Sequence, residues 1–268
     1  RNKSIFVIED CAHSIGAEFK GRKTGSFGDA AFFSFETIKP INTYGGGMVV
    51  TNDSNLASKI CKMRVYNKNH IVPLIKKIIS SRCEMYLLPT FFSFPFLYLL
   101  ASKYWNRKIY RIYRIAQNLS APKQPFSDFQ AFIGLEKLKT LKERVALRQA
   151  QAKLLVSLLN NKIAPQEIGE EMFPNYYFFV VLLPDNIDIW KAREFLLMHG
   201  IDTGIGAEIT DDCSVSLEQN GCPHTTEVFR HALQLPLYEG MSESNIRYMA
   251  EVLNKLFSND DKSTSILF

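Results

Sequence analysis

The sequence has few of the residues that build covalent cross-links and metal sites. Its five cysteines are an odd number without a Cys-x-x-Cys pair, which argues against a disulfide framework or a structural zinc site. Four histidines (His70, His199, His224 and His231) show no metal-ligand spacing, so we expect no bound metal. The cysteines are therefore predicted to be reduced packing residues of a cytoplasmic protein.

A strong excess of one charge is also absent. The formal net charge is +5, and charged residues make up 22% of the chain. This charge suits an anionic ligand, but the sequence lacks the clustered basic stripe of a nucleic-acid-binding protein. We therefore expect no nucleic-acid partner. The apolar content of 46% is sufficient for one sizeable core or two smaller ones.

Charge is missing altogether from Met85 to Ser102, a run long enough to be considered as a membrane span. Basic residues lie on both sides of it, however, and Pro89 and Pro95 would break a single straight helix. Two other interpretations stay open. The run forms either a hydrophobic helical hairpin buried against the protein or a partner subunit, or a membrane-surface insertion covering residues 85–115.

The pattern of the remaining sequence predicts an α/β protein. Short apolar runs predict buried strands, and longer periodic stretches with capping residues predict helices. A helix at 128–160 is expected to be amphipathic, with an apolar face formed by Phe129, Phe132, Ile133, Leu135, Leu138, Leu141 and Val145. The expected strands are 4–9, 30–35, 47–51 and 176–183, and the other expected helices are 54–64, 189–199 and 243–257.

Three polar residues and a glycine run form a recognisable chemical layout. Asp10 closes the first strand, Ser34 lies five residues before Lys39, and the run Gly45-Gly46-Gly47 follows the lysine. A lysine amine can form a Schiff base with an aldehyde cofactor, and a carboxylate can keep a pyridine nitrogen protonated. A hydroxyl and backbone N–H groups can hold a phosphate. This layout is typical of a pyridoxal phosphate (PLP) site.

The sequence around these residues resembles the DegT/DnrJ/StrS family of sugar aminotransferases, which have the aspartate aminotransferase fold. The similarity is carried by Val7–Ala17, Gly25–Ala31, Phe33–Phe35, Lys39, Gly45–Asp53 and Ser127–Leu135. The resemblance implies that Lys39 is the Schiff-base lysine and that Asp10 pairs with the pyridine nitrogen. It also implies that His13 lies beside the cofactor ring and that Ser34 binds the phosphate.

The same resemblance implies a fold and a domain organisation. We expect part of the PLP-transferase large domain, with a mostly parallel sheet and helices, followed by a smaller α+β domain. Residues 1–67 are then the C-terminal part of the large domain, 68–120 an insertion, 121–160 a linking helix region and 161–268 the small domain. Family members have a long segment before the first strand, so we expect this chain to be part of a longer protein, with an incomplete site on its own.

The implied function is PLP-dependent amination of a nucleotide-linked keto-sugar, with glutamate as amino donor, in surface-polysaccharide or related amino-sugar biosynthesis. The implied assembly is a homodimer. Contact of residues 85–115 with the inner membrane face would suit such an enzyme. Two alternatives stay open: a non-catalytic, membrane-associated homologue with a binding or regulatory role, and a PLP-dependent sugar dehydratase.

Overall fold

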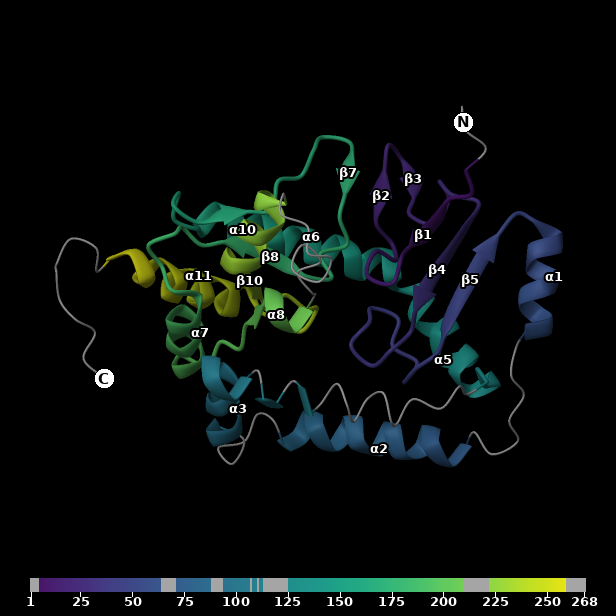
Figure 1. The fold of residues 1–268 in the computed structure, drawn as a ribbon, viewed down its shortest axis with the longest axis horizontal. Helices are drawn as coiled ribbons and strands as arrows, with labels where there is room; N and C mark the ends of the chain where they lie inside the picture. Colours follow the sequence, from purple (N-terminus) through teal and green to yellow (C-terminus); the bar gives the residue numbers. More distant parts are fainter. Residues whose placement is uncertain are drawn as a thin grey trace. The chain divides into compact units, whose positions relative to one another are not determined.

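The computed structural model describes residues 5–63, 71–87, 94–106, 108–109, 111–112, 125–209 and 222–258. The chain forms two compact units, and each is discontinuous in sequence (Figure 1). The first contains residues 1–92, 120–149 and 168–177, and the second contains 93–119, 150–167 and 178–268. The assignment of domain roles to residues 1–67, 68–120, 121–160 and 161–268 stays a prediction.

The first unit contains a mixed three-stranded sheet, in the order β1-β4-β5 (Figure 1). Strand β1 (Ile8–Asp10) is parallel to β4 (Ala30–Ser34), and β4 is antiparallel to β5 (Gly47–Thr51). The strand predicted at 47–51 has the expected bounds, whereas β1 and β4 are shorter than the predicted 4–9 and 30–35. A small antiparallel sheet, in the order β3-β2-β7, combines β2 (Glu18–Phe19), β3 (Arg22–Lys23) and β7 (Met172–Phe173).

Helix α1 (Ser54–Met63) follows β5 and begins where predicted. The Asp53 carboxylate caps it by accepting hydrogen bonds from the N–H groups of Asn55 and Leu56. The apolar segment then forms two helices, α2 (Ile71–Leu87) in the first unit and α3 (Phe94–Ala101) in the second. Across the part of the chain that the structure describes, no helix has the length and apolar character needed to cross a membrane.

The prediction of one continuous helix at 128–160 is wrong. The structure has α5 (Asp128–Lys139) and α6 (Leu141–Leu158), interrupted at Thr140. A tertiary contact accounts for the break, because the Arg144 guanidinium donates to the Lys137 carbonyl and to the Pro40 carbonyl. The Lys137 carbonyl thereby gains a partner other than the next turn of helix.

The apolar face predicted for this helix is also not buried along α5. The exposed fractions of Phe129, Phe132, Leu135 and Leu138 lie between 51% and 61%. The side of α5 that packs on the protein instead carries Gln130, which is buried. A capping box between Ser127 and Gln130 fixes the start of the helix.

The second unit is built on an antiparallel four-stranded sheet, in the order β6-β8-β10-β9. Buried side chains of β8 and β10, including Phe179 and Leu233, form its core with Leu196 of α7 and Met249 of α11. Gly200 follows α7 with φ of 76°, the left-handed conformation typical of a glycine that ends a helix. The elements of this unit not yet given bounds are β6 (Ala164–Pro165), β8 (Phe179–Leu182), α7 (Ile189–Met198), β9 (Gly204–Ile205), α8 (Gly206–Ile209), α10 (Pro223–His231), β10 (Ala232–Leu235) and α11 (Glu243–Ser258).

Candidate active site

Two of the predicted site residues lie at the carboxyl ends of neighbouring parallel strands. Asp10 ends β1 and is paired in register with Phe32 of β4, and Ser34 ends β4 two residues later. Because side chains alternate along a strand, Asp10 and Ser34 point to the same face of the sheet. The carboxyl ends of parallel strands are the usual place for a ligand in an α/β sheet.

The loop that carries Lys39 is anchored on both sides by apolar contacts. Phe35 and Ile41 are buried with Leu141 of α6 in one hydrophobic cluster. Side chains of α5 and α6 also bind the main chain of this loop. Arg144 of α6 donates to the Pro40 carbonyl and Lys137 of α5 donates to the Asn42 carbonyl, each at 2.7 Å. The backbone around Lys39 is therefore fixed by residues that are remote in sequence.

The glycine run after Lys39 forms a tight turn on the same loop. The N–H of Gly45 donates to the Phe35 carbonyl, and the Phe35 N–H donates to the Gly46 carbonyl. Gly46 has φ of 86°, and a Cβ atom there would lie 2.5 Å from a ring carbon of Phe126. Only glycine meets both requirements without strain. The turn returns the chain from Lys39 to β5.

The amine of Lys39 is half-buried and responds to nearby charges. Burial lowers its pKa below the usual value, and the carboxylates of Asp10 and Glu36 offset this effect in part. Burial also lowers the pKa of His13, with a second lowering contribution from the Lys39 charge and a raising contribution from Asp10. Asp10, His13 and Lys39 thus form one electrostatic group.

Tyr177 joins this group and was not predicted from the sequence. Its ring centroid lies 4.9 Å from that of His13 and 4.9 Å from the Lys39 ammonium nitrogen. No motif marks this residue, and its local signal is a pair of adjacent tyrosines at the start of the strand predicted at 176–183. Burial raises the pKa of Tyr177 to about 12, despite the opposing charge of Arg148.

The structure therefore brings together Asp10, His13 and Lys39, with Ser34 on the same sheet face as Asp10. A partly desolvated lysine beside a carboxylate, next to a strand-end hydroxyl and a glycine turn, is a set of groups that fits PLP. The roles of the four residues toward a cofactor stay predictions. Among the described residues, no group of three or more His, Cys, Asp or Glu side chains is arranged to hold a metal ion.

Solved structures show the fold of this chain. It aligns with the Helicobacter pylori aminotransferase PseC, described as involved in pseudoaminic acid biosynthesis, with a TM-score of 0.67, 18% identity and coverage of 96% of this chain and 60% of the other. It aligns with a DegT DnrJ EryC1 StrS aminotransferase from Brucella abortus with the same TM-score and identity, covering 95% of this chain and 58% of the other. These structures are aminotransferases of the PLP-dependent α/β fold, as the sequence predicted.

The sequence matches the DegT/DnrJ/EryC1/StrS aminotransferase family over residues 1–81 and 102–254, and the chain belongs to that family. It is 22% identical over 260 residues to a GDP-perosamine synthase of Escherichia coli O157:H7, covering 97% of this chain and 60% of the relative. A transaminase of Campylobacter jejuni named for UDP-4-amino-4,6-dideoxy-N-acetyl-beta-L-altrosamine is 48% identical over 61 residues, 23% of this chain and 16% of the relative. The chain spans about three fifths of the length of the relatives that it matches from end to end.

Proposed function

We propose that this chain supplies the lysine-bearing part of a PLP-dependent aminotransferase that acts on a nucleotide-linked keto-sugar. Glutamate is the proposed amino donor, and the product enters surface-polysaccharide or related amino-sugar biosynthesis. The observation that carries the proposal is the half-buried Lys39 amine, whose pKa is lowered and which interacts with Asp10 and His13. The names of the relatives support the sugar substrate class.

Four residues would hold the cofactor. Lys39 would bind its aldehyde, Asp10 its pyridine nitrogen and Ser34 its phosphate, and His13 would lie beside its ring. When bound, PLP supplies an electron-accepting ring that stabilises negative charge on the carbon attached to the transferred nitrogen.

The chain's own groups suit the proton movements of amino transfer. A lowered pKa leaves a larger share of the Lys39 amine neutral near pH 7, and the neutral amine is both the nucleophile and the base. The Asp10 carboxylate raises the Lys39 pKa in part, so the amine stays able to return the proton. Partial burial limits competing exchange with water.

Borohydride trapping tests this proposal. The chain is incubated with PLP, alone and extended by the upstream residues of its own gene, and then reduced, digested and examined by mass spectrometry. We expect a pyridoxyl group on Lys39 that glutamate prevents, and none in a Lys39→Ala variant. No selective label on Lys39 in either form would contradict the assignment. Product analysis with and without glutamate distinguishes amino transfer from dehydration.

We propose that the protein is a homodimer and that α5 contributes to the interface. The outer face of α5 exposes Phe129, Phe132 and Leu135, with exposed fractions of 55%, 61% and 61%. Asp128, Glu136 and Lys139 lie on the same helix, so the face combines apolar area with charges of both signs. Such a face suits a protein partner. Light scattering after size exclusion should show a dimer that Phe132→Glu dissociates; a wild-type monomer would contradict the proposal.

We propose in addition that the protein works in the cytoplasm and contacts the inner membrane face through residues 85–115. In the described part of this segment, Tyr86, Phe96 and Trp105 are 45–71% exposed. The Lys108 ammonium lies 4.3 Å from the Tyr104 ring centroid, so basic and aromatic groups adjoin as they do at membrane surfaces.

Helix α2 of the first unit carries an apolar stripe of its own. Val72, Ile75, Ile79 and Tyr86 recur at helical spacing on one side and are 48–71% exposed. Lys76 and Arg82 lie on either side of this stripe, whereas Glu84, the helix's one acidic residue, lies away from it. An apolar stripe with basic flanks suits an anionic bilayer.

Vesicle co-sedimentation tests the membrane contact. We expect binding to phosphatidylcholine vesicles that contain phosphatidylglycerol and weaker binding to phosphatidylcholine alone. Ile79→Glu should abolish binding, and Met63→Glu, at an exposed position on α1, should leave it unchanged. Equal pelleting of the two variants, or no pelleting of the wild type, would refute the membrane contact without touching the assignment of Lys39.

A further inference from the structure

One aromatic ring contacts both the lysine and the histidine of the candidate site. The Tyr177 ring lies 4.9 Å from the Lys39 ammonium and packs against the His13 ring with an interplanar angle of 36°. Burial is the main cause of the lowered pKa values of Lys39 and His13. Tyr177 is thus placed to influence both.

A buried asparagine fixes the position of this tyrosine. The Asn175 side-chain oxygen accepts from the Tyr177 N–H at 3.0 Å, and its amide donates to the carbonyls of His13 and Ile15 at 2.9 and 3.0 Å. One side chain therefore joins the turn before Tyr177 to the loop after Asp10. Buried, multiply bonded amides of this kind fix local geometry firmly.

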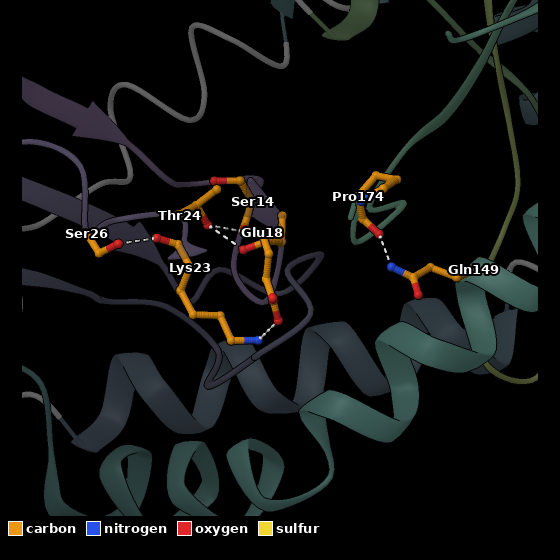
Figure 2. Close-up of polar contacts among 8 residues, drawn as sticks. Ser14, Glu18, Lys23, Thr24, Ser26, Gln149 and Pro174 are labelled. Atoms are coloured by element: carbon orange, nitrogen blue, oxygen red, sulfur yellow. Dashed lines mark hydrogen bonds and ion pairs between the residues drawn. The ribbon is translucent and has the colours of Figure 1, made fainter. Parts of the chain in front are cut away.

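Helix α6 holds the same turn from the other side. Gln149 donates to the Pro174 carbonyl at 2.9 Å, as Figure 2 shows, and Arg148 donates to the Tyr176 carbonyl at 3.0 Å. Tyr176 has φ of 45°, a left-handed conformation that these contacts maintain. The Tyr177 backbone is consequently held by α6 as well as by the loop that carries His13.

The chemistry of the ring favours a positioning role over proton transfer. With a pKa of about 12, the phenol stays protonated and uncharged throughout the physiological range. The face of its ring attracts an ammonium group, and its apolar body excludes water from the groups it covers.

We propose that Tyr177 is a positioning residue of the Lys39 site, whose ring orients the lysine amine and the His13 imidazole and limits water around both. The ring does this by contact with each group, and the hydroxyl is dispensable. The inference concerns the geometry of the site and does not depend on which sugar the protein aminates.

Three substitutions separate the contributions of the ring. Tyr177→Ser removes the cover from His13, so the His13 pKa should rise. Tyr177→Leu keeps apolar cover but has no aromatic face, so the Lys39 pKa should fall by about half a unit, the size of an exposed cation–π interaction. Tyr177→Phe keeps both features and should leave both pKa values at the wild-type level.

Both pKa values can be measured without cofactor or substrate. Hydrogen–deuterium exchange at the imidazole C2 position reports His13, and competitive acetylation across pH reports Lys39, each resolved by peptide mass spectrometry. Tyr176→Phe, in the same turn, is the control and should shift neither. Circular dichroism checks that each variant folds. If Tyr177→Ser does not fold, Tyr177→Leu and Tyr177→Phe still test the proposal through the Lys39 pKa.

The proposal predicts that the Lys39 pKa in Tyr177→Phe equals the wild-type value and that it is lower in Tyr177→Leu. An unchanged Lys39 pKa in Tyr177→Leu would overturn it. So would an unchanged His13 pKa in a folded Tyr177→Ser, or a shift in Tyr177→Phe as large as in the other variants, because the hydroxyl would then be the active group.

Discussion

The side-chain amide of Gln130 on α5 donates a hydrogen bond of 3.0 Å to the main-chain carbonyl of Thr43, and it also reaches the Gly45 carbonyl at 3.2 Å. Gln130 is buried, and Thr43 is fully buried. The glycine turn that follows Lys39 is therefore tied to α5 through one polar side chain.

Replacing Gln130 with methionine should loosen this turn. Methionine has a similar size but no donor, so the two carbonyls would lose a partner in a buried environment, at a cost of about 1–3 kcal/mol of unfolding free energy. Urea denaturation measures the loss, and amide exchange should increase at residues 36–46. The exposed Gln166 offers a control, since Gln166→Met should change stability by less than about 0.5 kcal/mol. Equal effects at the two positions would contradict the assignment.

A methyl group at Gly46 should be destabilising for two reasons. The backbone is left-handed there, and the added Cβ would meet the Phe126 ring at 2.5 Å. Gly21 also has a positive φ, of 70°, but an added Cβ would find open space. Gly46→Ala should therefore lower the unfolding free energy by at least about 1 kcal/mol more than Gly21→Ala. Thermal melts of the two variants test this; matching losses would show that the Phe126 contact is unimportant.

Glu9 should give the protein an acid-sensitive contribution to stability. Its carboxylate accepts from the N–H groups of Gly25, Phe27 and Gly28 at 2.6–2.8 Å. Burial alone would raise the pKa of Glu9, but these donors and Arg22 outweigh it, so the folded pKa lies below the usual value. Stability from this group is then complete above the unfolded pKa of about 4.3 and is lost as pH falls through the folded pKa.

Glu9→Gln removes this pH dependence. The variant should be less stable than wild type by about 1 kcal/mol at pH 7, and the difference should shrink as pH falls below about 4.3. Urea midpoints between pH 3 and 7 measure it. Glu170→Gln, at an exposed position, serves as control. A difference that stays constant over the whole range would show that the charge of Glu9 does not contribute.

Asp10→Asn should make the Lys39 amine less basic. Asp10 raises the pKa of both Lys39 and His13, so its neutralisation should lower both values further. Competitive acetylation of Lys39 against pH measures the first shift and imidazole exchange the second. Glu18→Gln should move neither. If Lys39 titrates unchanged in Asp10→Asn, the two groups are not coupled and the proposed site loses its electrostatic basis.

Local signals predicted much of the fold. The strand at 47–51 and the helices beginning at Ser54, Ile189 and Glu243 appear where alternation and capping residues placed them. The break at Thr140 was missed because no glycine or proline marks it. It depends on Arg144, which donates to the Pro40 carbonyl of the Lys39 loop and to the Lys137 carbonyl of α5, and helix propensity does not encode these contacts.

The site residues that lie close together in the sequence could be predicted, whereas the one from a distant segment could not. Asp10, His13, Ser34 and Lys39 lie within one short stretch, so their motif identifies them together. Tyr177 comes from a distant segment, and its role depends on Asn175 rather than on any local pattern. The apolar face of α5 was predicted from periodicity but its exposure was not, because periodicity shows that a face is apolar and does not show what covers it.

The bonds of Asn175 also set an order of events during synthesis. Asn175 lies 162 positions after His13, so the loop around His13 leaves the ribosome well before the asparagine that binds it. At about 5–20 residues per second, the interval is roughly 8–30 s. During that time the lysine loop and the loop after Asp10 exist without the tyrosine that covers them. The covered form of the Lys39 site is therefore complete only after the second half of the chain has been translated.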